Sequence, residues 1–160
     1  MLIDLWVSRL FALFIGIDNY ANVRNLKGAA ADARRMKDYM QRTFRLPDDH
    51  TKELLNNEAS RDNIIAELKS LANNESIQRG DAILIYYAGH GDLIPAPTGW
   101  PSGRPDKKIQ SIVPQDFCKD NIDVIPDRTI GNLINMIEEK HGNNIVSRNV
   151  SHTVSLITSF

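Results

Sequence analysis

The fold is decided by the stretch Asp81-Ala-Ile-Leu-Ile-Tyr-Tyr-Ala-Gly-His90-Gly91, a continuous apolar run that ends in a histidine between two glycines. Such a run is typical of a strand that is buried on both faces of a parallel sheet. Histidine is the side chain whose unperturbed pKa lies closest to neutral, so an imidazole at the end of this strand can accept and return protons. The flanking glycines let backbone N–H groups approach a substrate closely. The stretch therefore predicts a buried strand that presents His90 as a reactive group.

Strands and helices alternate before this stretch. Leu10 to Ile17 is apolar and ends in the turn-forming Asp18-Asn19-Tyr20, which predicts a first strand, and Lys52 to Leu55 predicts a second. A helix is expected after Gly28, because apolar residues recur there at helical spacing: Ala30, Ala33, Met36, Met40 and Phe44. Ser60 is expected to cap a second helix with the apolar stripe Ile64, Ile65, Leu68 and Leu71. This alternation predicts an α/β fold with a mainly parallel sheet.

The segment after His90 is expected to complete the site. Ligands of open parallel sheets bind at the carboxyl ends of the strands, where this reading places His90. The Pro- and Gly-rich stretch from Pro95 to Pro105 predicts a long surface loop that walls a binding groove beside the histidine. A short extended piece is expected at Ile109 to Val113. Pro126-Asp127 predicts the start of a last helix that ends near His141-Gly142 and has an apolar face of Ile130, Leu133, Ile134 and Ile137.

Composition limits the classes of function. A chain of 160 residues with 42% hydrophobic residues fits one folded domain, and a net charge of -1 argues against a nucleic-acid partner. The single Cys118 excludes an internal disulfide and a multi-cysteine zinc site. The apolar amino terminus is interrupted by Asp4, Ser8 and Arg9, so it resembles neither a signal peptide nor a membrane-spanning helix. We therefore expect a cytoplasmic protein with no membrane partner.

Several motifs together resemble a known family. They are Phe14-Ile-Gly-Ile-Asp-Asn-Tyr20, Leu26-Lys-Gly-Ala-Ala-Ala-Asp-Ala33, Tyr86-Tyr-Ala-Gly-His-Gly91, Ile112-Val-Pro-Gln-Asp-Phe117 and Ile125-Pro-Asp-Arg-Thr-Ile130. This combination resembles the caspase-like cysteine peptidases, and most of all the metacaspase-type branch common in fungi. The resemblance implies a three-layer sandwich. It divides the chain into an extension at 1–9, a partial caspase-like catalytic domain at 10–145, similar to the caspase large subunit, and a divergent tail at 146–160.

The resemblance implies a Cys-His dyad that cleaves a peptide or protein substrate. In this family a thiolate attacks the peptide carbonyl while the imidazole protonates the leaving amine and later activates water. By this resemblance His90 is the catalytic imidazole, the Gly91 N–H helps to hold the oxyanion, and Asp32 binds an Arg or Lys before the cut. Caspases proper use an arginine where this chain has Leu26, which also favours basic specificity. Alternatively, Asp32 has no role in binding and is an ordinary charge in the first helical turn, where the helix dipole favours it.

The nucleophile is missing from its expected place. Caspase-type cysteines lie about 50 residues beyond the histidine, at the end of the next strand. Residues 139–160 contain no cysteine, and Cys118 lies in a different segment, so it is read as a bystander. We therefore expect a chain truncated before the catalytic cysteine, with no nucleophile and no peptidase activity of its own. Val146-Ser147 can be encoded by GTA AGT, a common intron start, so the tail is expected to be intron read-through.

Truncation has a consequence for the sheet. Without the family's later strands, the fold is expected to be incomplete at its carboxyl-terminal side, and the strand from Asp81 to Ala88 becomes an apolar edge prone to association. The β-prone tail from Val150 to Phe160 is the candidate to cover that edge.

Two other readings of function remain open. One is a pseudo-enzyme or peptide-binding module that uses the groove of Asp32 and His90 or the exposed edge. The other is an unrelated hydrolase in which His90 works with Asp92 or Asp18, with or without a metal. The four histidines, at positions 50, 90, 141 and 152, lack metal-ligand spacing, so no metal and no cofactor are expected. Calcium enters only through the resemblance, because some metacaspases need it, and no EF-hand loop is present.

Overall fold

The computed structural model describes residues 9–101 and 103–151. Along the chain the elements are β1 (Leu10–Gly16), α1 (Ala29–Phe44), β2 (Thr51–Leu55), α2 (Arg61–Asn73), β3 (Ala82–Gly89), β4 (Gly91–Pro95), β5 (Lys108–Ile112), β6 (Ile125–Pro126), α3 (Asp127–His141) and β7 (Ile145–Ser151). Two short 3-10 helices, Asp48–His50 and Asn56–Glu58, flank β2. None of the helices in these ranges is long and apolar enough to cross a bilayer.

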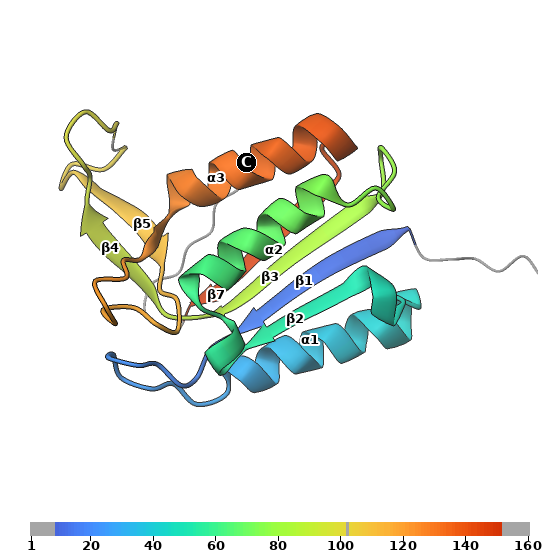
Figure 1. Cartoon of the computed structure of the whole chain (residues 1–160), viewed down its shortest axis with the longest axis horizontal. Coiled ribbons are helices and arrows are strands. Elements are labelled where there is room, and N and C mark those ends of the chain that lie inside the picture. The colour runs from blue at the N-terminus through green and yellow to red at the C-terminus, as the bar shows by residue number, and fades with distance from the viewer. Residues whose placement is uncertain (1–8, 102, 152–160) are drawn as a thin grey trace, which may run out of the picture.

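A parallel sheet forms the centre of the molecule. Its strand order is β2-β1-β3-β7, and each neighbouring pair is parallel, which confirms the predicted α/β class (Figure 1). The two central strands, β1 and β3, are almost wholly buried, as their uninterrupted apolar sequences predict. The helices expected after Gly28 and Ser60 and at Asp127 are all present.

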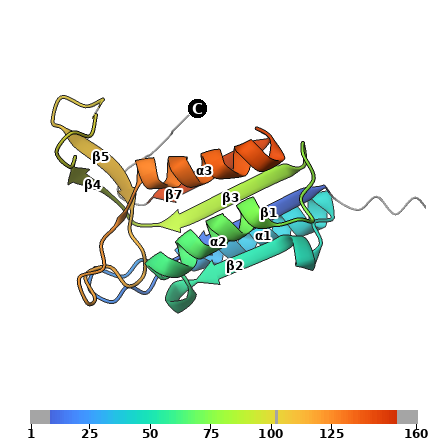
Figure 2. The same cartoon turned by 45° about the horizontal axis from the view of Figure 1, so that its top comes forward.

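Helices cover both faces of this sheet and make three layers (Figures 1 and 2). On one face α1 packs its buried alanines against Phe14 and Tyr86. On the other face α2 and α3 contribute Leu68 and Ile137 to a larger cluster around Leu13. Phe44, predicted to belong to the apolar stripe of α1, does not pack in the core. Its side chain is 51% exposed, and its ring contacts the Tyr39 ring edge-on.

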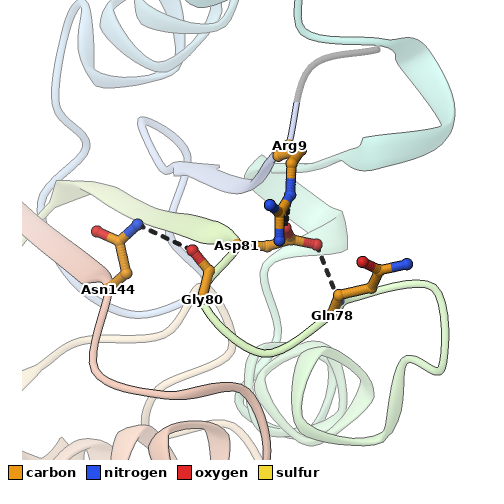
Figure 3. A network of polar contacts seen from close by, with 5 residues as sticks. All are labelled: Arg9, Gln78, Gly80, Asp81 and Asn144. Atoms are coloured by element: carbon orange, nitrogen blue, oxygen red, sulfur yellow. Dashed lines mark hydrogen bonds and ion pairs between the residues drawn. The ribbon is translucent and has the colours of Figure 1, made fainter.

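Polar contacts tie the strands together at the amino end of the sheet (Figure 3). Asp81 is only 4% exposed and accepts hydrogen bonds from the Arg9 guanidinium and, at 2.8 Å, from the Gln78 N–H. Asn144, just before β7, donates to the Gly80 carbonyl at 3.3 Å. A buried carboxylate needs such partners, because unpaired burial is costly. This end of the sheet is thereby fixed, and His90 lies at the opposite end.

The predicted sheet edge at β3 is wrong. Residues of β7 pair with β3 along its length, from Ile83 opposite Ile145 to Gly89 opposite Ser151. Pairing of parallel strands requires backbone groups rather than an apolar sequence, so the polar centre of β7 does not prevent it. β7 also crosses the boundary expected after residue 145. Among the described residues, the edge strands of this parallel sheet are β2 and β7. Residues 152–160, which belong to the segment predicted to cover the edge, lie outside the described residues.

The expected Pro- and Gly-rich loop and the extended piece expected at Ile109 to Val113 are both present, but a strand that was not predicted precedes the loop. Gly91–Pro95 forms β4, which pairs antiparallel with β5, so the Pro- and Gly-rich residues connect the two strands of a hairpin. β6 extends this ribbon to three strands. The hairpin projects from the carboxyl end of the main sheet (Figure 1). A strand beginning directly after His90 gives the histidine a fixed backbone on both sides.

Candidate active site

The backbone of His90 is held by two tyrosines and a neighbouring strand end. Its N–H donates to Tyr20 Oη at 2.7 Å, and its carbonyl accepts from Tyr87 Oη at 2.8 Å and from the Val113 N–H at 3.0 Å. Tyr87 Oη also lies 3.0 Å from the Val113 carbonyl. These contacts come from the ends of β1, β3 and β5, so the position of His90 depends on the assembled fold.

The imidazole of His90 has a defined tautomer. Its ring packs against the Tyr20 ring at a centroid distance of 4.8 Å, and its Nε2 lies 2.7 Å from the Arg24 carbonyl oxygen. A carbonyl oxygen can only accept a hydrogen bond, so Nε2 must carry the proton. In the neutral ring Nδ1 then carries the lone pair that a general base requires.

Gly89 lets the tyrosines approach the histidine. A Cβ atom at this position would lie 2.5 Å from Tyr87 Oη and 2.7 Å from Tyr20 Oη, closer than real contacts allow. Burial raises the pKa of Tyr20 to about 12 and, as the largest cause, raises the pKa of Tyr87 well above its ordinary value. Both hydroxyls are therefore neutral at physiological pH and remain available as hydrogen-bond partners of His90.

This burial predicts an alkaline loss of stability. Because the folded-state pKa of Tyr20 is raised from 10.0 to about 12, its contribution to stability is constant below pH 10 and is lost as the pH rises from 10 through 12. Tyr20→Phe should reduce the slope of the unfolding free energy against pH by up to about 1.4 kcal/mol per pH unit in that window. Urea unfolding of both proteins at several alkaline pH values measures the slopes. Equal slopes would contradict this assignment.

Asp32 lies in the first turn of α1, as predicted. The amino end of this helix is fixed by Asp18, whose carboxylate accepts from the Ala29 N–H at 2.8 Å and from the Ala30 N–H at 3.2 Å. Asp32 itself is one-third exposed and accepts a hydrogen bond from Arg35 at 2.5 Å. Its negative charge contributes to the raised pKa of Tyr86, after burial. The carboxylate thus lies on the α1 face of β3, within reach of solvent.

Gly91 and Cys118 occupy different surroundings. Gly91 opens β4 opposite Ile112, directly after His90. Cys118 is exposed in the segment after β5, where its N–H donates to the Ile122 carbonyl at 2.9 Å. The carboxyl end of β7, which pairs with the end of β3, is where a neighbouring strand brings residues toward His90. Position 151, at that end, is a serine.

The hairpin connection lines a cleft, but His90 and Asp32 are not among the cleft's lining residues. The cleft has a volume of about 1060 Å³ and lies between the hairpin, α3 and the start of β7. Trp100 and Arg128 both line it, with the Arg128 guanidinium 5.0 Å from the centroid of the Trp100 ring. The groove expected beside the histidine is therefore not this cleft.

The two carboxylates considered as partners of His90, Asp18 and Asp92, have other contacts. Asp18 caps α1, and Asp92 is exposed, with its carboxylate accepting from the N–H of the next residue. Across residues 9–101 and 103–151, no group of three or more histidine, cysteine or acidic side chains is arranged to hold a metal ion.

Sequence reasoning missed the groups that orient His90. Tyr20 and Tyr87 belong to the quoted motifs, but their apolar neighbours indicate only burial. The Arg24 carbonyl is a backbone group, which has no signature in the sequence. A signal for Tyr20 existed, since a tyrosine in the turn after β1 lies at the same edge of the sheet as His90, where the parallel strands end.

Comparisons with known proteins identify the family. A model of the Caspase domain family matches residues 9–140. Metacaspase-9 of Arabidopsis thaliana is 28% identical over 171 residues, which cover 92% of this chain and 51% of that protein. Metacaspase-6 of the same plant is 28% identical over 125 residues, which cover 72% of this chain and 33% of that protein. The chain thus spans about half or less of the length of these relatives.

A solved structure has a similar fold. Protein GSU0716 from Geobacter sulfurreducens matches with a TM-score of 0.67 and 18% identity, over 89% of this chain and 49% of that chain. A likeness at this level of identity concerns the fold alone. With a family match from residue 9 to residue 140 and a parallel sheet between layers of helices, the chain belongs to the caspase domain family and is similar to its metacaspase-type members.

Proposed function

We propose that this chain is a caspase-like cysteine peptidase domain of the metacaspase type that recognises peptides through Arg or Lys and, as these 160 residues, does not hydrolyse them. The observation that carries the proposal is the contact of His90 Nε2 with the Arg24 carbonyl at 2.7 Å. With Nε2–H donating to that carbonyl, the lone pair of the neutral ring is on Nδ1, at the carboxyl end of a parallel sheet. That arrangement suits an imidazole that transfers protons for a nucleophile on a neighbouring strand.

The proposed chemistry divides between groups that are present and one that is absent. His90 would protonate the leaving amine and then activate water, and the Gly91 N–H would stabilise the oxyanion. No cysteine follows Cys118 in the sequence, so neither β7 nor the tail after it supplies a thiol. Cys118 is exposed in another segment and has no role in the proposal. Under this proposal, these 160 residues bind a peptide and lack the thiol that the covalent step needs.

Charge supports the basic specificity. Asp32 is an acidic group at the amino end of α1, one-third exposed, and already binds a guanidinium, that of Arg35. A carboxylate accepts hydrogen bonds from a guanidinium with good geometry, and Lys supplies a point charge in the same place. The side chain before the scissile bond would bind at this carboxylate.

A second candidate function is a binding or regulatory module of the same fold. The absence of a cysteine from residues 119–160 favours it, because the intact imidazole and carboxylate would then serve only to bind a peptide. The two candidates differ in one respect. In the peptidase lineage a restored thiol should be activated by His90, whereas a module that has diverged further need not activate it.

Peptide binding tests the specificity. Asp32→Asn should weaken the binding of a short arginine-containing peptide about five- to tenfold, because it removes a charge-assisted hydrogen bond from a partly exposed site. Calorimetric titration measures the affinity, and the same peptide with citrulline in place of arginine should bind equally to both proteins. The matched control is Asp38→Asn, the same substitution at an exposed site on the same helix. Equal effects of the two substitutions would refute the role of Asp32.

A further inference from the structure

The carboxylate proposed to bind a basic residue already has a basic partner from its own helix. Arg35 Nη2 lies 2.5 Å from Asp32 Oδ1, three residues further along α1. The side chain of Arg35 is 73% exposed and that of Asp32 is 33% exposed, so the pair lies open to solvent. A peptide that approaches Asp32 therefore meets a carboxylate whose Oδ1 atom is occupied by a guanidinium.

A second arginine lies near the same group. Arg148 of β7 is opposite Tyr86 in the sheet register, and Tyr86 packs on the α1 face of the sheet. Burial and, after it, the charge of Asp32 raise the pKa of Tyr86. The charges of Arg148 and Arg35 lower the same pKa by smaller amounts. One tyrosine hydroxyl thus experiences the carboxylate and both arginines. Within the part of the chain that the structure describes, the Asp32 carboxylate accepts a side-chain hydrogen bond from Arg35 alone.

We infer that Arg35 is an internal competitor for the Asp32 carboxylate and sets the affinity of this site for a basic peptide residue. The inference rests on the proposed function, since it assigns a second residue to the same site. A substrate arginine carries the same guanidinium as Arg35 and requires the same oxygen atoms. A bidentate contact that uses both carboxylate oxygens therefore requires Arg35 to release Oδ1, and its long, exposed side chain can leave without disturbing the core.

The size of the competition follows from the kind of ion pair. Exposed pairs three residues apart on a helix contribute little to stability, because solvent screens them and two side chains lose freedom. Removal of the competitor should therefore tighten binding of an arginine peptide only about two- to fivefold. A neutral peptide residue does not compete for the carboxylate and should bind unchanged.

The experiment uses the 160-residue chain and two short peptides that differ only in arginine or citrulline. Arg35→Gln should bind the arginine peptide about two to five times more tightly than the unmodified chain, at physiological salt, by calorimetric titration. In an Asp32→Asn background, Arg35→Gln should have no effect. The matched control is Arg34→Gln, which removes the same charge from an exposed neighbouring position of α1.

The outcomes separate this inference from the proposed function. If Asp32→Asn weakens binding but Arg35→Gln leaves it unchanged, the competitor role is wrong and the basic site stands. If Arg34→Gln tightens binding as much as Arg35→Gln does, the effect is general charge repulsion, which also overturns the inference. If neither the unmodified chain nor Arg35→Gln shows binding that depends on Asp32, the proposed specificity itself fails.

Discussion

A cysteine placed at the carboxyl end of β7 should become a reactive thiol that depends on His90. Ser151 is opposite Gly89 in the sheet register, one residue before the histidine on the neighbouring strand. In a Cys118→Ser background, which removes the exposed native thiol, Ser151→Cys should be alkylated by an arginyl chloromethyl ketone at least about ten times faster than a control thiol. A positioned base contributes roughly 10²- to 10⁴-fold in such steps, so tenfold is a conservative expectation.

The controls for this experiment are cysteines placed at other positions of β7 and just after it. Ser147→Cys makes the same substitution opposite Ile85, roughly 13 Å earlier along β7 at about 3.3 Å per residue. His152→Cys tests the next position in the sequence. The alkylation rate of Ser151→Cys should fall to that of Ser147→Cys when His90→Ala is added. Equal rates for all three thiols, or rates that ignore His90, would show that this strand end does not serve the imidazole.

Gly16→Ala should destabilise the fold strongly, because α1 lies against the end of β1. A Cβ atom there would lie 2.7 Å from Ala33 Cβ, 2.8 Å from Ala30 Cα and 2.9 Å from the Ala29 carbonyl oxygen. Two of these atoms are helix backbone, so the clash is relieved only by moving α1 away from the sheet. Overpacking of this kind costs about 1–3 kcal/mol. Thermal unfolding should show a Tm lower by roughly 2–12 °C for a domain of this size.

Gly131→Ala is the matched control for this substitution. Gly131 lies within α3, and among the described residues a Cβ atom there has no atom within 4 Å apart from its chain neighbours and the nearby backbone of its own helix. Replacing a helical glycine should stabilise the chain by about 0.5–1 kcal/mol, so the two variants should shift Tm in opposite directions. A Tm for Gly16→Ala at or above that of the unmodified protein would contradict the close packing of α1 on β1.

The sequence predicts the sheet well where burial determines the pattern. β1 and β3 are apolar throughout, and the apolar stripes of α2 and α3 have helical spacing. The presence of these strands and helices, and their order along the chain, therefore follow from periodicity alone. β4 and β7 were not predicted as strands. β4 is short and half exposed, and β7 has Ser, Arg and Asn at its centre. Their positions depend on backbone pairing with β5 and β3, which the side-chain pattern does not reveal.

The candidate site also contains some residues that the sequence predicts and some contacts that it does not. His90 and Asp32 stand out in the sequence because their residue types carry chemistry at the ends of predicted elements. The partners that orient His90 are less visible, because one is the Arg24 carbonyl and the others are tyrosines within apolar runs. The pairing of Arg35 with Asp32 is an ordinary helical spacing that becomes informative only with the carboxylate assigned a role. Residue type is thus predictable here, whereas the geometry that selects a tautomer is not.

The central proposal is that these 160 residues hold a proton-transferring imidazole, His90, and no thiol placed to serve it. The most direct test is hydrolysis of a fluorogenic arginyl peptide by highly purified protein, beside a His90→Ala variant purified in the same way. The account predicts no release of fluorophore above buffer for either protein. Steady turnover by the unmodified chain that disappears in His90→Ala would contradict it.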